Sequence, residues 1–195
     1  MPSGAADGAM AIRGGWLVAA DREPSPNADL RPGGEVPSLL VIHNISLPPG
    51  VFGGGEIRAF FTNCLDRRGD PYFEQIADLR VSAHLLIDRR GVMTQFVSFL
   101  DRAWHAGVSC FEGRERCNDF SIGIELEGTD TQPYTDRQYA VLAAVAVALM
   151  RAYPAITPAR IRGHSDIAPG RKTDPGESFD WPRFRALVEQ RGSVT

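Results

Sequence analysis

The residues with the clearest chemical potential lie in one segment near the carboxyl end of the chain. Residues 164–174 hold His164, Lys172 and Asp174 in a stretch rich in glycine and proline, a composition that argues against a regular helix or strand. Loops of this kind lie at the surface and often carry binding or catalytic groups. Imidazole and carboxylate are ligands of catalytic zinc, which keeps one coordination position open. The segment therefore favours a zinc-dependent hydrolase.

His43 is the second candidate ligand because of its place in the chain. It ends the apolar run at residues 38–43, which predicts a central strand covered on both faces. Open α/β sheets bind their ligands at the carboxyl ends of such strands. His84 lies inside an apolar strand and His105 follows Trp104, so we interpret these two histidines as packing or supporting residues.

Spacing alone is weak evidence for this metal site. No two histidines show the His-Glu-x-x-His spacing of a helical zinc motif, so the ligands must come from distant segments. On residue type alone, each histidine is more often a hydrogen-bonded structural residue than a ligand. Lys172 taken by itself is more often a solvated surface charge.

Other common catalytic arrangements are missing from the sequence. Cys64, Cys110 and Cys117 form no Cys-x-x-Cys or Cys/His cluster, so we do not expect them to bind the metal. The sequence has no Gly-x-Ser-x-Gly turn of a serine hydrolase. The glycines at residues 53–55 are not followed by the Lys-Ser/Thr pair of a phosphate-binding loop. These absences leave metal-assisted hydrolysis as the favoured chemistry.

Several segments predict strands that would position these side chains. Residues 84–87 and 92–96 are apolar and flank a turn, which predicts a hairpin. Residues 119–127 alternate between apolar and polar side chains, which predicts a strand with Glu125 and Glu127 on its polar face. A hairpin combined with interspersed helices indicates an α/β fold with a central mixed β-sheet flanked by helices.

The predicted helices lie between and after these strands. A short helix is expected near residues 56–62, and a capping box at Thr135 begins a long amphipathic helix that ends before Pro154. A last helix is expected at residues 181–190, with a proline in its first turn. The proline-rich residues 22–37 are expected to cross the surface as an extended coil.

Composition limits the possible partners. The chain has 195 residues, is 43% hydrophobic and 23% charged, and carries a net charge of −3, values typical of one soluble globular domain. A mildly acidic chain lacks the positive charge for general nucleic-acid binding. The longest apolar run, residues 139–150, is too short to span a membrane. We expect a monomer without nucleic-acid or membrane partners.

The cysteines and the amino-terminal residues suggest the compartment. An odd number of cysteines makes a disulfide framework improbable and fits a reducing environment. Residues 1–14 lack the apolar core of a secretory signal and read as a disordered tail, followed by one domain at residues 15–195. We therefore expect a cytoplasmic protein.

Seven motifs together resemble one known family. They are VIHN (41–44), RVSAH (80–84), RAWHAG (102–107), GRERCND (113–119), SIGIELEGTD (121–130), GHSDIAP (163–169) and KTDPG (172–176). In this order they resemble the superfamily of type-2 N-acetylmuramoyl-L-alanine amidases and peptidoglycan recognition proteins. Within it, the resemblance is to the cytosolic branch that acts on 1,6-anhydro-muropeptides. It covers nearly the whole chain beyond the tail.

The resemblance implies a role for each matched residue. It places the zinc ligands at His43, His164 and Asp174, and the catalytic pair at Glu125 and Lys172. Contacts to the muropeptide are implied for four further residues: Asn44, Arg80, Ala103 and Arg116.

The implied reaction is hydrolysis of the amide between 1,6-anhydro-N-acetylmuramic acid and L-alanine during cytoplasmic peptidoglycan recycling. Glu125 would accept a proton from the attacking water, and Lys172 would help zinc to stabilise the oxyanion. Arg80 and Arg116 would bind the carboxylates of the stem peptide. An effect on β-lactamase induction would follow indirectly from removal of the substrate.

Two other functions remain open at this point. Recognition proteins of the same superfamily bind peptidoglycan fragments without cutting them, but they commonly lose a zinc ligand, and all three are present here. An exported amidase that acts on intact cell wall would share the zinc site. The missing export signal argues against that alternative.

Overall fold

The frame of the molecule is a six-stranded mixed sheet. In the computed structural model, which describes residues 10–193, the strand order is β12, β5, β11, β6, β7, β3. The first four of these strands are parallel, β7 is antiparallel to β6, and β3 is parallel to β7. This confirms the predicted mixed sheet and the predicted hairpin. The strands are β3 (Asp21–Arg22), β5 (Leu39–Ile45), β6 (Leu85–Ile87), β7 (Met93–Gln95), β11 (Ser121–Glu127) and β12 (Ile161–Gly163).

Strand β11 is buried more completely than its alternating pattern predicts. Strand β11 is buried along its whole length, so the polar face predicted for Glu125 and Glu127 does not face solvent. The apolar side chains of β11 enter the main core, as expected. On its polar face, Ser121 contacts His105 and the Glu127 carboxylate accepts from the backbone amides of Gly53 and Arg89, contacts that the alternating pattern could not reveal.

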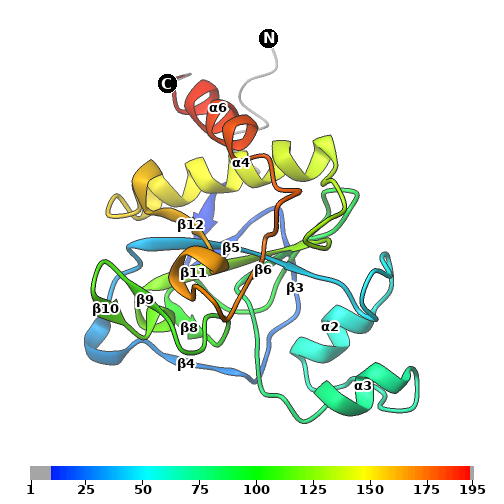
Figure 1. The fold of residues 1–195 in the computed structure, drawn as a ribbon. Coiled ribbons are helices and arrows are strands. Elements are labelled where there is room, and N and C mark those ends of the chain that lie inside the picture. Colours follow the sequence, from blue (N-terminus) through cyan, green and yellow to red (C-terminus); the bar gives the residue numbers. More distant parts are fainter. Residues whose placement is uncertain (1–9, 194–195) are drawn as a thin grey trace.

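Helices α4 (Asp136–Ala152) and α6 (Trp181–Gly192) form a layer on one side of the sheet, with α6 outermost (Figure 1). The predicted capping box is present: the Thr135 hydroxyl accepts from the Gln138 amide, and the Gln138 side chain accepts from the Thr135 amide. The buried Gln138 amide group also donates to the backbone of β6 and β11. The helix is therefore tied to the sheet beside the end of β11 as well as packed on it.

A second, smaller apolar cluster lies at the other side of the sheet. Helix α2 (Glu56–Phe61) matches the predicted short helix, whereas α3 (Pro71–Ile76) was not predicted. Its signal is nonetheless present in the sequence, because Asp70 caps the helix and Pro71 occupies its first turn. Aromatic side chains of both helices pack with Phe96. This cluster supports one wall of the cavity described below.

The amino-terminal segments also contain more structure than expected. Strand β1 (Ile12–Arg13) falls within the predicted tail. Ile12 packs on the main core, and this contact stabilises the ordered conformation of the segment. Residues 1–9 lie outside the described residues. Strand β4 (Ala28–Leu30) interrupts the expected coil at residues 22–37. Within residues 10–193, no helix is both long and apolar enough to cross a membrane.

The remaining elements are short. They are β2 (Trp16–Leu17), η1 (Pro32–Gly34), β8 (Asp101–Ala103), β9 (Cys110–Phe111), β10 (Arg114–Glu115), η2 (Cys117–Asp119), η3 (Pro158–Arg160) and α5 (His164–Ile167).

Candidate active site

Neighbouring parallel strands bring the main site residues to one edge of the sheet. His43 on β5 stands directly opposite Glu125 on β11 in the strand register. On the other side of β5, strand β12 ends at Gly163 and His164 follows at once. Carboxyl ends of adjacent parallel strands meet at one edge, which is why residues far apart in sequence meet here. His164 begins the short helix α5, so the prediction of no regular element in this segment was wrong at that point.

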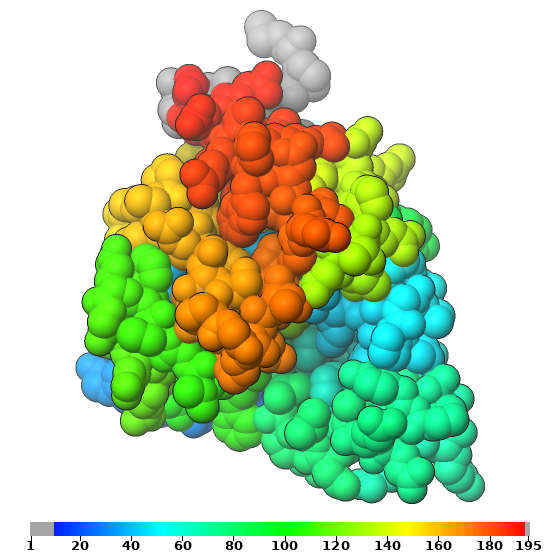
Figure 2. All heavy atoms as spheres, viewed as in Figure 1, coloured from blue at the N-terminus to red at the C-terminus, as the bar shows by residue number. Residues whose placement is uncertain are grey.

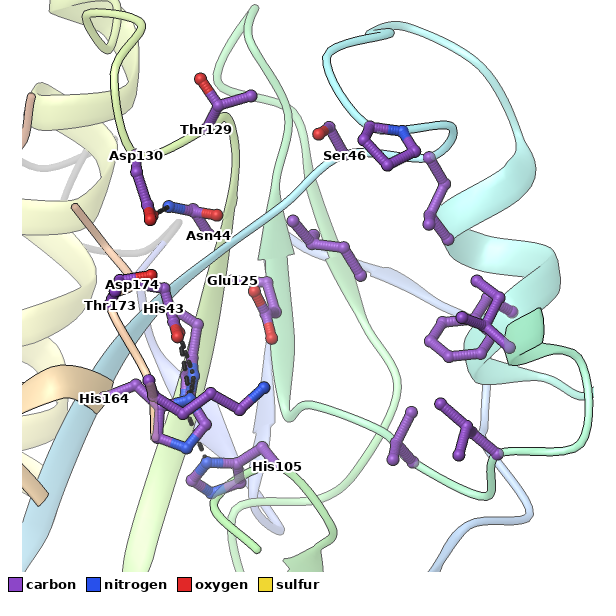
Figure 3. Close-up of a pocket in the computed structure, with 18 of the residues that line it drawn as sticks. His43, Asn44, Ser46, His105, Glu125, Thr129, Asp130, His164, Thr173 and Asp174 are labelled. Atoms are coloured by element: carbon purple, nitrogen blue, oxygen red, sulfur yellow. Dashed lines mark hydrogen bonds and ion pairs between the residues drawn. The ribbon is translucent and has the colours of Figure 1, made fainter. Parts of the chain in front are cut away.

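Three side chains converge on a shared point at this edge. Oδ2 of Asp174 lies 2.9 Å from Nδ1 of His43 and 3.1 Å from Nδ1 of His164, and the two Nδ1 atoms are 3.0 Å apart (Figure 3). All three residues are buried, and one ligand atom of each lies within 4.8 Å of the others. Ligands of a tetrahedral zinc ion, each about 2.0–2.1 Å from the metal, lie roughly 3.3 Å apart. The two nitrogens and one oxygen therefore fit zinc with small adjustments.

The electrostatics of these groups also suit a cation. Burial lowers the pKa of His43 to about 4, because the buried site disfavours the imidazolium form. Burial alone would raise the pKa of Asp174, but hydrogen bonds from His164 and His43 outweigh it and hold the pKa below its ordinary value. A neutral imidazole and an ionised carboxylate are the forms that bind metal ions.

Glu125 lines the same cavity as these three groups. Its side chain is buried, and within the described part of the chain its Oε2 atom makes no hydrogen bond. Burial raises its pKa well above the ordinary value, the charge of Asp174 raises it further, and Lys172 opposes the shift. A carboxylate with a raised pKa and a free oxygen is a suitable general base.

The converging groups lie at one side of a cavity of about 710 Å³. In the space-filling view, a hollow separates the orange segment near residues 165–175 from the blue-green surface of α3 (Figure 2). The wall opposite the histidines is largely apolar and comes mainly from α2, α3 and the residues after α3. Its members include Phe60, Tyr72, Ile76, Leu79, Val81 and Trp104. The cavity can therefore hold a ligand with an apolar face beside the polar edge.

The residues predicted to contact substrate divide into two groups. Asn44 lines the cavity, and its side-chain amide donates to Asp130 at 2.8 Å. Lys172, on the loop before Asp174, also lines the cavity. Arg80, Ala103 and Arg116 are not among the described residues that line the cavity. Their roles stay predictions.

Each residue of the second group has other contacts in the structure. Arg80 donates to the backbone carbonyls of Ala77 and Leu79, and Arg116 pairs with Asp119 at 3.2 Å. Ala103 is fully buried in β8 and packs in the cluster beneath α2 and α3. Two exposed arginines can change rotamer to reach a ligand, whereas Ala103 offers only its backbone to one.

Supporting residues missed by sequence reasoning hold Asp174 in place. The Tyr134 hydroxyl donates to the carbonyl of Pro175 at 2.7 Å. Gly176 lies so close to the loop after β11 that a Cβ atom there would be 2.1 Å from Cα of Asp130. Tyr134 and Asp130 follow the strand that carries Glu125. The loop after β11 therefore positions the ligand carboxylate as well.

We expect Gly176→Ala to destabilise the protein by about 2 kcal/mol or more. Gly176 has φ +82°, so alanine adds backbone strain to the clash with Asp130, and each contributes roughly 1–3 kcal/mol. Urea unfolding measures the effect. Gly170→Ala is the matched control, because Gly170 has φ +75° but no atom within 4 Å of the added Cβ. Equal stabilities of the two variants would contradict the assigned contact.

Comparisons with known proteins agree on one family. Residues 33–177 match the family model described as N-acetylmuramoyl-L-alanine amidase. The chain is 65% identical over 174 residues to a 1,6-anhydro-N-acetylmuramyl-L-alanine amidase, AmpD, of Salmonella typhimurium, covering 89% of this chain and 92% of that protein.

Two solved structures extend the comparison. A crystal structure of a selenomethionine derivative of AmpD has a TM-score of 0.90 at 64% identity, covering 92% of this chain and 99% of that one. The Escherichia coli amidase AmiD, in complex with the substrate anhydro-N-acetylmuramic acid-L-Ala-D-γ-Glu-L-Lys, has a TM-score of 0.58 at 30% identity. That match covers 77% of this chain and 57% of AmiD.

Proposed function

The chain belongs to the N-acetylmuramoyl-L-alanine amidase family, and we propose that it is the zinc-dependent enzyme that releases the peptide from 1,6-anhydro-muropeptides. The bond cut is the amide between the lactyl group of 1,6-anhydro-N-acetylmuramic acid and L-alanine. The observation that carries the proposal is the convergence of His43, His164 and Asp174 beside Glu125, whose Oε2 atom has no hydrogen-bond partner within residues 10–193. We further propose that the reaction serves peptidoglycan recycling in the cytoplasm and that the protein acts as a monomer.

The metal and the protein divide the chemistry between them. When bound to His43, His164 and Asp174, zinc supplies Lewis-acid polarisation of a carbonyl and makes water more acidic. Glu125 takes the proton from the attacking water at a carboxylate oxygen and later returns it to the departing nitrogen of L-alanine. Lys172 lines the same cavity, where its ammonium group stabilises the negative charge that develops on the carbonyl oxygen.

The substrate class rests on relatives and on the cavity. The relatives that match most of the chain are described as 1,6-anhydro-N-acetylmuramyl-L-alanine amidases, and AmiD binds an anhydro-muropeptide. The cavity offers an apolar wall for a sugar ring that lacks a free reducing end, and a polar rim for the peptide backbone. Asn44 is held at this rim by Asp130, which leaves its amide oxygen as an acceptor for an N–H group of the peptide.

We expect removal of the metal to abolish turnover reversibly. The purified protein should contain about one zinc ion per chain, and a chelator should reduce hydrolysis of anhydro-MurNAc-tripeptide at least 100-fold, because the chemistry then loses its Lewis acid. Added zinc should restore the rate. Turnover that persists in fully metal-free protein would exclude the zinc mechanism.

The same assay separates this function from an amidase of the intact wall. The enzyme should release L-alanine peptides from anhydro-muropeptides much faster than from insoluble peptidoglycan, measured at equal concentrations of the cleavable bond. Equal rates on both substrates would reject the proposed role in recycling but not the zinc site.

A further inference from the structure

Both imidazoles of the proposed zinc site turn their second nitrogen toward the same short segment, His105–Ala106. Nε2 of His43 lies 2.9 Å from Nδ1 of His105. Nε2 of His164 lies 3.1 Å from the carbonyl oxygen of Ala106. In the close-up, the His105 ring stands beside His43 on the side away from Asp174 (Figure 3). The His105–Ala106 segment therefore contacts the Nε2 atoms of both histidines.

The contact to Ala106 suits the metal-binding tautomer of His164. A carbonyl oxygen can only accept a hydrogen bond, so it pairs with Nε2 when Nε2 carries the proton and Nδ1 holds the metal. The Arg171 guanidinium donates to the same carbonyl at 2.6 Å and also lies 3.3 Å from Nε2 of His164.

The contact to His105 suits the same tautomer of His43 through one further step. The Ser121 hydroxyl lies 3.2 Å from Nε2 of His105 and can accept its proton as a hydrogen bond. Nδ1 of His105 then accepts the Nε2 proton of His43 at 2.9 Å, which leaves Nδ1 of His43 available to the metal.

We propose that His105 is a positioning residue that acts through His43, and that the His105–Ala106 segment prepares both histidines to bind the metal. The inference rests on the proposed zinc site and adds a role to a residue outside its ligands. Outer hydrogen bonds of this kind orient a ligand ring and increase its basicity. Losing one typically costs about 10–100-fold in metal affinity.

The surrounding structure holds this segment from two directions. The Asn118 side-chain oxygen accepts from the backbone amides of His105 at 3.1 Å and Ala106 at 2.8 Å. On β11, Gly123 leaves room for the ring, because a Cβ atom there would lie 2.4 Å from Cγ of His105. Gly123, which leaves space, and Asn118, which binds the backbone, therefore both keep the His105 ring in its position.

The test compares zinc dissociation constants, measured by competition with a chromophoric chelator, in full-length variants. His105→Phe fills the ring space without an acceptor and should weaken zinc binding about 10–100-fold. His105→Gln restores an acceptor oxygen and should bind within about fivefold of wild type.

The matched control is His84→Phe. His84 is fully buried and its ring lies 5.7 Å from that of His105, but its nitrogens contact the Gly123 N–H, the Asp101 carbonyl and the Arg31 guanidinium instead of a ligand histidine. It should bind zinc within about threefold of wild type, well below the loss expected for an outer-shell partner. An equal loss in His84→Phe and His105→Phe would assign the effect to general loosening and overturn the inference.

A second pair of variants tests the segment without changing either ring. Asn118→Ala removes the acceptor for both amides and should weaken zinc binding about tenfold, whereas Asn118→Asp keeps an oxygen there and should not.

The outcomes separate this inference from the proposed function. Wild type that binds one zinc ion, with His105→Phe and Asn118→Ala binding equally tightly, would overturn the positioning role alone. Wild type that binds no zinc would overturn the proposed zinc site and the inference with it.

Discussion

Glu125→Gln is expected to lower kcat by about 10²–10⁴-fold while the protein still binds zinc. Glutamine keeps the shape of the side chain but cannot take a proton from the attacking water. Glu125 is not one of the three converging groups, and its Oε2 atom has no partner among the described residues, so the change removes chemistry without removing a ligand. Steady-state rates on an anhydro-muropeptide and zinc content of the same samples measure both quantities.

The matched control is Glu127→Gln, two residues further along the same strand. The Glu127 carboxylate accepts from the backbone amides of Gly53 at 2.6 Å and Arg89 at 3.0 Å, so it stabilises the backbone of two loops. Placing an amide N–H group against one of these donors should cost about 1–3 kcal/mol of stability. The kcat of this variant should change less than tenfold, well under the loss expected for a general base.

The stabilities of the two variants should change in opposite directions. Burial raises the pKa of Glu125, so the metal-free folded state favours the protonated form more than the unfolded chain does. Above the ordinary pKa of 4.5, the buried charge therefore costs stability, and this cost grows as the pH rises toward the folded-state pKa. Metal-free Glu125→Gln should be at least as stable as wild type at pH 7. Normal turnover in Glu125→Gln with zinc bound would reject Glu125 as the base.

The position of the site could be predicted because its signals are local. The apolar run that precedes His43 identifies a buried strand, so this one segment is enough to mark the histidine at its end as a candidate ligand. The glycine and proline content near Asp174 likewise identifies a loop. That these two segments lie together could not be predicted from sequence spacing, because their proximity depends on the pairing of β12 with β5. Only the resemblance of the motifs to a known family joined them in advance.

The contacts of the supporting residues could not be predicted because their signals are not local. The sequence identifies His105 only as a packing or supporting residue, and its contact with His43 joins residues 62 positions apart. The alternating pattern places Glu125 and Glu127 on one face of β11 but does not show what covers that face. The same reason explains why Gly123 reads as an ordinary strand glycine, although it leaves room for the His105 ring.

Asp174→Asn should have the largest effect on metal binding. It removes the only negative charge among the three converging groups, and an amide oxygen is a much weaker zinc ligand than a carboxylate. We expect zinc affinity to fall more than about 100-fold, beyond the range typical of an outer hydrogen-bond partner. Turnover at submicromolar zinc should fall below detection. Titration of metal-free protein with zinc, followed by activity at each point, measures both effects.

Asp166→Asn provides the matched control for this variant, because it changes a carboxylate in the same segment. Asp166 accepts from the Gly163 amide at 2.8 Å and lies outside the converging group, and an asparagine oxygen can keep that bond. Its zinc affinity and kcat should stay near those of wild type, so a loss confined to Asp174→Asn would show that the charge matters at one position only. Wild-type zinc affinity in Asp174→Asn would mean that the ion binds elsewhere, and the roles assigned to His43 and His164 would then fail together.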